Sequence, residues 1–280
     1  MKNLLLTFLV FVIVLLAGCT NTRNNGDNTQ VSSSEALKIV GYSVEPIDGV
    51  YEGESVYIEA QITNAGDNVV ENIVPKVIGL PTSFSLQEQP DSIPELEPSN
   101  FTETLTWVYI PTAMYSTITY PFEIGIDYDY RSHSEAIIRV ASREWIRSLP
   151  KEQQDIEKNK LGEPEEVPES GPIQTQFKLS SRTPYAENGQ VTVYLEITNV
   201  GGGRPVNDDV TLTVSSGDLV CDNAGSVKMV NGQKGYMKCT AYIGDVTEWK
   251  NIEASIELFY KYSIRKTDLT VKVFGQSEQI

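Results

Sequence analysis

One strand pattern occurs twice in the chain, together with the turn that ends it, and this repetition constrains the fold more than any other feature. Apolar and polar side chains alternate over residues 56–63 and again over residues 191–198, and each run leads into Ile-Thr-Asn-x-Gly. The separation between the two runs is 135 residues throughout. Alternation with a period of two is typical of a β-strand with one buried face. Each run therefore predicts a half-buried strand that ends in the same type of turn.

A second pair of matching strands lies downstream, at a separation of 132 residues. Apolar and polar side chains alternate over residues 122–130 and 254–262, and both runs end in Tyr-x-Tyr. Two matched strands at nearly the same separation indicate that a domain has been duplicated. The alternative is a chance agreement between long alternating strands, but the shared turn and the shared Tyr-x-Tyr ending argue against it. The alignment also places Cys239 opposite Trp107.

Short strands and frequent turn signals, without a helical period of 3.6 residues, predict an all-β fold. The turn signals are Gly53, Asp67-Asn68, Pro90, Pro98, Asn188-Gly189, Gly201 to Gly203 and Asn231-Gly232. Such spacing favours an antiparallel sandwich over an α/β sheet. We therefore expect two tandem immunoglobulin-like (Ig-like) antiparallel β-sandwiches, one in residues 35–142 and one in residues 173–280. These two ranges are called the first segment and the second segment below.

The first segment resembles a known group of exported repeats. Its Asn64-Ala65-Gly66 turn, its Leu96-Glu97-Pro98 phrase and its Tyr128-Asp129-Tyr130 ending are similar to the cell-adhesion-related and surface-layer-associated Ig-like repeats of archaeal and bacterial exported proteins. The chain departs from that pattern by carrying Ser99 where the repeats have glycine, and the second segment lacks the Leu-x-Pro phrase. The resemblance implies a structural or binding role.

The N-terminus predicts export and a lipid anchor. An apolar run over residues 4–17 would form a helix only about 21 Å long, too short for the hydrocarbon core of a bilayer. Residues 1–18 are therefore interpreted as a signal peptide. Leu16-Ala17-Gly18-Cys19 resembles the lipobox of prokaryotic lipoproteins, which implies that Cys19 receives a diacylglyceryl group. The alternatives are a signal peptide with an incidental cysteine and an uncleaved anchor.

Residues 19–34 carry almost no apolar side chains, so they predict a polar tether between the lipid and the first segment. The mature chain is then expected to be extracytoplasmic, anchored by its lipid to the membrane at the cell surface or in the periplasm. The net charge of the chain is −16, which repels phosphate backbones. Nucleic acid is therefore not expected as a partner.

Residues 143–172 predict an acidic, partly helical connector between the two segments. Pro150 suits the first turn of a helix and Gly162 suits its end, so a short helix is expected between them. Trp145 and Ile146 are too apolar for a freely solvated linker. The favoured interpretation is that they pack on a neighbouring domain, and the alternative is that they form a contact surface for a partner.

Cys221 and Cys239 are the two thiols that remain after lipidation of Cys19. An even number of cysteines in an exported domain predicts a disulfide between them. Two buried free thiols or a redox pair are the alternatives, but the two residues do not have the Cys-x-x-Cys spacing of a redox motif.

The remaining candidates carry weaker signals. Asp127 and Asp129 share a strand face and could bind calcium, but a solvated acidic face explains them better, so neither a metal nor another cofactor is predicted. His133 lies in a stretch interpreted as a polar turn, without the partner groups that a catalytic base needs.

Phe259 falls on the polar side of its strand, and it marks a contact surface if that side is exposed. Asn100 begins a glycosylation sequon, which matters only in an organism that glycosylates exported proteins.

These features favour a non-enzymatic cell-surface lipoprotein whose Ig-like domains bind or adhere to a protein or glycan partner. The alternative is a structural accessory subunit of a membrane or envelope complex. An enzyme or a solute-binding protein is the least favoured class, because the sequence shows no recognisable catalytic motif.

Overall fold

The computed structural model describes residues 34–98, 101–112, 115–161, 164–167, 170–179, 189–222, 225–242, 244 and 247–275. The signal peptide, the lipobox with Cys19, the tether up to residue 33 and the sequon residue Asn100 lie outside these ranges. Within the described ranges, no helix is both long and apolar enough to cross a membrane.

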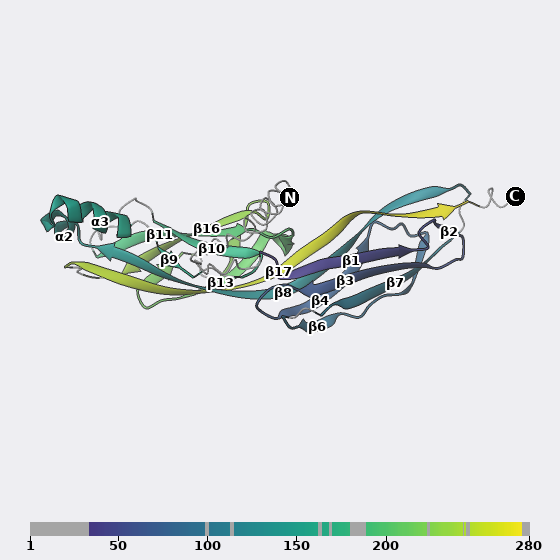
Figure 1. Ribbon diagram of the computed structural model, residues 1–280, viewed down its shortest axis with the longest axis horizontal. Coiled ribbons are helices and arrows are strands. Elements are labelled where there is room, and N and C mark those ends of the chain that lie inside the picture. The colour runs from purple at the N-terminus through teal and green to yellow at the C-terminus, as the bar shows by residue number, and fades with distance from the viewer. Residues whose placement is uncertain are drawn as a thin grey trace, which may run out of the picture. The chain divides into compact units, whose positions relative to one another are not determined.

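The described part consists mainly of antiparallel strands, which confirms the all-β prediction (Figure 1). Two of its sheets have four strands each, and each of these sheets uses strands of one segment only. The first has the order β1-β3-β7-β5 and contains β1 (Leu37–Glu45), β3 (Val56–Asn64), β5 (Phe84–Glu88) and β7 (Glu103–Pro111). The second has the order β10-β11-β16-β14 and contains β10 (Ile173–Leu179), β11 (Gln190–Asn199), β14 (Leu219–Cys221) and β16 (Lys234–Tyr242). The strands with the duplicated pattern, β3 and β11, both occupy the second position in their sheets.

The third sheet has nine strands and combines both segments. Its main path is β15-β13-β17-β8-β4-β6, formed by β15 (Val227–Lys228), β13 (Asp209–Ser215), β17 (Trp249–Phe274), β8 (Ile118–Ala141), β4 (Val70–Ile78) and β6 (Ile93–Leu96). Three short strands join it at the side, namely β2 (Val50–Tyr51), β9 (Glu165–Glu166) and β12 (Arg204–Pro205). A 3-10 helix, η1 (Val206–Asp208), precedes β13.

The long strands β8 and β17 pair with each other and run through both halves of this sheet (Figure 1). Their ladder extends from Ala141 opposite Trp249 to Ile118 opposite Val273. The end of β8 therefore lies among strands of the second segment, and the end of β17 lies beside the start of β8 and beside β2. The sequence indicated separate sandwiches and gave no sign that each segment contributes a strand to the other.

The polar turn expected around His133 is not present, because β8 continues straight through this stretch. Ser132 and Ser134 occupy positions that point into the core, where the alternating pattern elsewhere places apolar side chains. The Ser134 hydroxyl lies 2.7 Å from the Thr175 hydroxyl on β10, so its polar group is satisfied. Two small polar residues at buried positions thus concealed the strand from an analysis of hydrophobic periodicity.

One face of the nine-stranded sheet is buried and the other is largely open. The even-numbered side chains of β8 from Phe122 to Val140 are buried, whereas most odd-numbered ones are half-buried or exposed. In β17 the even-numbered side chains from Ile252 to Tyr262 are buried. A bulge between Lys266 and Leu269 shifts the register, so that beyond it the odd-numbered side chains from Leu269 to Val273 are the buried ones. Both four-stranded sheets therefore pack on the same face of the long sheet, around one continuous core.

Asn199, at the end of β11, is buried and has four hydrogen-bond partners. Its Nδ2 donates to the carbonyls of Gly203 and Gly232, both at 2.9 Å. Its Oδ1 accepts the N–H of Gly201 at 3.1 Å and the hydroxyl of Tyr262 at 2.7 Å. Burial raises the pKa of Tyr262 to about 12, so the hydroxyl stays protonated and donates at neutral pH. A Cβ on Gly201 would lie 2.7 Å from that hydroxyl, which explains the glycine.

Asn64, at the end of β3, makes the corresponding bonds. Its Nδ2 donates to the carbonyls of Asn68 and Leu96 at 2.9 and 2.7 Å, and its Oδ1 accepts the N–H of Gly66 at 3.0 Å. A Cβ on Gly66 would lie 2.7 Å from the hydroxyl of Tyr130, the same distance as in the other turn. The two Asn-x-Gly turns are therefore alike in their bonds and in their close tyrosine, as well as in their letters.

The connector contains two helices, α2 (Arg143–Ser148) and α3 (Lys151–Leu161). The predicted helix is α3, which begins directly after Pro150. Both helices follow the end of β8, and Figure 1 shows them at one end of the long sheet, far from β1, β3 and β7. The connector therefore does not separate the two segments in space.

Ile146 is buried in a small cluster with Ala141 and Leu161, and Trp145 packs against this cluster. The contacts of this cluster lie within the connector itself and with Ala141 at the end of β8. Ile146 is consequently not available as a contact residue, because only 1% of its surface is exposed.

Candidate functional site

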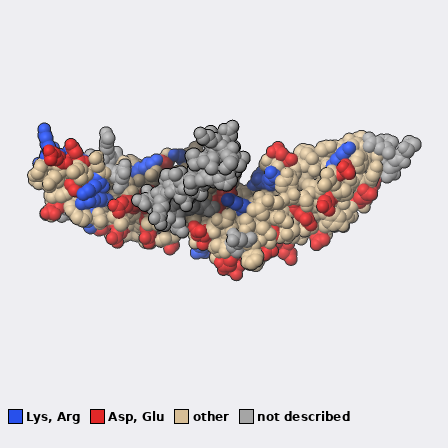
Figure 2. Space-filling model, viewed as in Figure 1, with Lys and Arg blue, Asp and Glu red and all other residues tan. Residues whose placement is uncertain are grey.

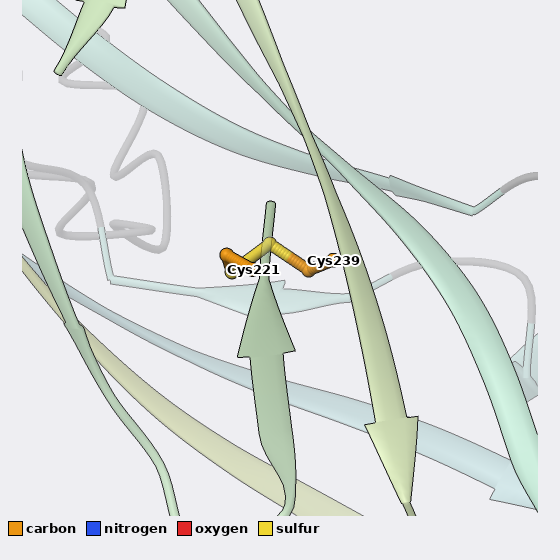
Figure 3. The surroundings of a disulfide bond; sticks show 2 residues. All are labelled: Cys221 and Cys239. Atoms are coloured by element: carbon orange, nitrogen blue, oxygen red, sulfur yellow. A yellow bond between two sulfur atoms is a disulfide. The ribbon is translucent and has the colours of Figure 1, made fainter. Parts of the chain in front are cut away.

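Cys221 and Cys239 form the predicted disulfide (Figure 3). They are directly opposite each other in the ladder between β14 and β16, so the bond ties the short β14 to its neighbour. Cys239 faces Val193 of β11, as Trp107 faces Ile58 of β3. The alignment of Cys239 with Trp107 thus holds in three dimensions, and a cystine occupies the core position of a tryptophan.

Asp127 and Asp129 have partners that oppose calcium binding. Asp127 Oδ2 lies 2.6 Å from Lys76 Nζ, and Asp129 Oδ2 accepts a hydrogen bond from Asn72 Nδ2 at 2.9 Å. Burial alone raises the pKa of Asp127, but the combined effects of Lys76, Ser263 and Lys261 outweigh it and lower the pKa. Among the residues that the structure describes, no group of three or more His, Cys, Asp or Glu side chains could hold a metal ion.

His133 projects from the open face of β8, where half of its side chain is exposed. Its Nε2 lies 3.4 Å from Glu135 Oε1, two residues along the same strand. The hydroxyls of Ser132 and Ser134 point to the opposite, buried face. The neighbouring serines therefore cannot pair with the imidazole as nucleophiles, since strand geometry directs them away from it.

Phe259 is exposed on the same open face, with 40% of its surface accessible. The guanidinium of Arg131, its cross-strand partner, lies 5.2 Å from the ring centroid. Both residues line a groove of about 460 Å³ together with His133, Thr211 and Glu257. The described residues that line this groove include none from the connector helices. Among the described residues, Phe259 is therefore exposed and is not covered by the connector helices.

Trp249 is a second exposed aromatic residue on this face, and the sequence analysis did not single it out. Its surface is 45% accessible, and the guanidinium of Arg139 lies 4.2 Å from its ring centroid. Arg139 also lies 3.4 Å from Glu157 of α3. The spacing between the two residues could have identified Trp249. It precedes Phe259 by an even number of residues on β17, so both side chains lie on the same face of the strand.

The side chains between these two rings form a shallow hollow along β8 and β17, which we call the outer trough. It consists of Trp249 and the five cross-strand pairs Asn251–Arg139, Glu253–Ile137, Ser255–Glu135, Glu257–His133 and Phe259–Arg131. Two further grooves, of about 670 and 590 Å³, continue the groove at Phe259 toward Trp249. At the usual strand rise, the ten-residue step from Trp249 to Phe259 spans about 33 Å. The outer trough is therefore long enough to hold an extended chain.

Comparison with known proteins gives only distant similarities. No family model matches the sequence, and no curated protein matches it. The structure is similar to that of the secreted serine protease VesC from Vibrio cholerae, with a TM-score of 0.23, 10% identity and coverage of 79% of this chain and 50% of that chain. A protein of unknown function from Porphyromonas gingivalis W83 has a TM-score of 0.22 and 10% identity over 74% of this chain and 83% of that one. Escherichia coli alpha-2-macroglobulin activated by porcine elastase has a TM-score of 0.24 and 8% identity over 86% of this chain and 33% of that one. At these TM-scores the similarities carry no argument about function.

Proposed function

We propose that this protein is a non-enzymatic, lipid-anchored extracytoplasmic protein whose two tandem Ig-like sandwiches hold a protein partner on the outer trough. The lipobox residues that end at Cys19 support the lipid anchor. The Cys221–Cys239 disulfide supports an oxidising compartment outside the cytoplasm. The tandem arrangement is supported by the matching bonds of Asn64 and Asn199, and by the two four-stranded sheets that face one shared sheet.

The observation that carries the binding function is the pair of exposed aromatic rings, Phe259 and Trp249, on the open face of β8 and β17. Large rings lose contact with water when a partner covers them, and their rigidity keeps the entropy cost of binding low. Each ring already has a guanidinium beside it, which restrains its orientation before a partner arrives. Aromatic residues of this kind are enriched at the contacts that contribute most to protein–protein binding.

A structural role in a membrane or envelope complex is the second candidate, and it is favoured by the long ladder between β8 and β17, which a single bulge interrupts. Independent domains joined by a flexible linker change their relative orientation freely, whereas a shared sheet resists bending. Such a ladder would let the protein act as a rigid spacer between the membrane and a bound neighbour.

Photocrosslinking in intact cells tests the binding function. With benzoyl-phenylalanine in place of Phe259, we expect one dominant crosslinked protein, because this ring is placed in the contact. The same probe in place of Tyr57, which is also exposed but lies on β3 of a four-stranded sheet, is the matched control and should give little product. Equal crosslinking from both positions, or none from position 259, would contradict the proposed binding face.

A further inference from the structure

The distribution of charge along the outer trough indicates what kind of partner it fits. Three glutamates, Glu135, Glu253 and Glu257, project from successive cross-strand pairs in its middle. Glu253 and Glu257 form no ion pair with any described residue, and the ion-pair partner that the structure gives for Glu135 is His133. Among the described residues, the middle of the trough therefore carries three carboxylates that have no lysine or arginine as an ion-pair partner.

The cations of the trough lie at its two ends, where they are already engaged. Arg131 stacks on Phe259, and Arg139 stacks on Trp249 and pairs with Glu157. Among the described residues, neither Arg131 nor Arg139 forms an ion pair with one of the three central glutamates. The pattern from end to end is thus an aromatic ring with an arginine, then three carboxylates, then a second aromatic ring with an arginine.

We propose that the outer trough binds a basic, extended polypeptide segment of a partner protein. Lysine or arginine side chains of the segment would face the three central glutamates, and apolar side chains at its two ends would cover Phe259 and Trp249. About ten extended residues match the 33 Å between the rings. This inference rests on the proposed function, because it names the partner class of the same surface.

Charge complementarity distinguishes this occupant from the alternatives. Nucleic acids and acidic glycans would bring negative charge to the central carboxylates, which costs free energy. A neutral glycan could stack on the two rings but would leave the glutamates without a counter-charge. The whole molecule is acidic, and Figure 2 shows acidic side chains spread over the visible face with fewer basic ones among them. The test must therefore separate binding in the trough from a general attraction between an acidic protein and a cation.

The experiment uses fluorescence anisotropy with the full mature chain and a labelled peptide of about ten residues in which alanine and lysine alternate between a leucine at each end. We expect the peptide to bind, and we expect Glu253→Gln with Glu257→Gln to weaken binding about tenfold, since two contacts of about 0.7 kcal/mol each are lost. The matched control is Glu88→Gln with Glu95→Gln, which removes the same charge from exposed positions of the first segment. This control should change the affinity less than about twofold.

Three outcomes would overturn the basic-segment proposal. The first is an equal loss of affinity in the trough variant and in the control, which would show a general charge effect. The second is an absence of binding while all variants keep the melting temperature of the parent. The third is binding of a neutral polysaccharide that Phe259→Ala abolishes, without any binding of the lysine peptide. Crosslinking from position 259 that persists in Glu253→Gln with Glu257→Gln would retain the binding function and reject only the basic partner.

Discussion

Expressed separately, residues 35–142 and residues 173–280 are expected to remain unfolded, and to form one folded complex when they are produced together. The first fragment lacks the part of β17 that carries Leu269, Val271 and Val273, and the second lacks the part of β8 that carries Ile138 and Val140. Losing two or three buried aliphatic side chains removes about 4–8 kcal/mol, and an exposed strand edge is left as well. That loss is comparable with the whole stability of a typical domain, about 5–15 kcal/mol.

Circular dichroism and size-exclusion chromatography measure this outcome. Each fragment alone should lack a cooperative melt, and the mixture should melt cooperatively and elute as a heterodimer. The control is the full chain cut once by a protease within the connector, which should stay associated because β8 and β17 remain paired. Two fragments that fold independently and do not bind each other would contradict the shared sheet.

Replacing Asn199 or Asn64 by alanine is expected to lower the free energy of unfolding by about 3–5 kcal/mol in each case. Asn199→Ala leaves the carbonyls of Gly203 and Gly232 without their side-chain donor, and Asn64→Ala does the same to those of Asn68 and Leu96; in each turn one of the two bonds is buried and the other partly buried. An unsatisfied buried polar group costs about 1–3 kcal/mol. Because the two turns share their bonding, the two losses should be similar.

Urea denaturation, monitored by tryptophan fluorescence, gives both values. Asn251→Ala is the matched control, because this asparagine is exposed on β17, and it should change the free energy of unfolding by less than about 0.5 kcal/mol. A large effect at Asn199 with a small effect at Asn64 would show that the turns are not equivalent in energy, and would weaken the case for duplication.

Much of the local structure could be predicted from the sequence. Alternation over residues 56–63 and 191–198 predicted β3 and β11, Pro150 predicted the start of α3, and the even pair of cysteines predicted the disulfide. In each case a short-range rule was sufficient. The prediction of a turn around His133 was wrong because Ser132 and Ser134 occupy buried positions of a strand. Only the tertiary structure shows that the Ser134 hydroxyl has a partner there, Thr175 of β10.

The pairing of β8 with β17 could not be predicted in the same way. Period-two alternation identifies which face of a strand is buried, but it does not identify the neighbouring strand. Phe259 could be identified from the sequence because it is an apolar residue at a position where the alternation predicts a polar one. Trp249 could not, because it is the first residue of β17 and no alternation precedes it. The outer trough exists only because both residues belong to one long strand, so it could not be assembled before the length of that strand was known.

A cross-strand disulfide test addresses the shared sheet most directly. The carbonyl of Glu135 accepts the N–H of Val167 at 3.0 Å, so it points away from β17, and Glu135 and Ser255 form a pair without mutual hydrogen bonds. Such pairs have Cα atoms about 4.5 Å apart, which a disulfide can bridge. The mismatched pair of positions 135 and 259 would be separated by about 13 Å along the strand.

Mass spectrometry of the oxidised, monomeric protein should therefore detect a bond between positions 135 and 255 in Glu135→Cys with Ser255→Cys, and none in Glu135→Cys with Phe259→Cys. The native Cys221–Cys239 bond should be present in both variants. Absence of the 135–255 bond, or its formation only between two molecules, would contradict a sheet in which β8 and β17 of one chain pair with each other.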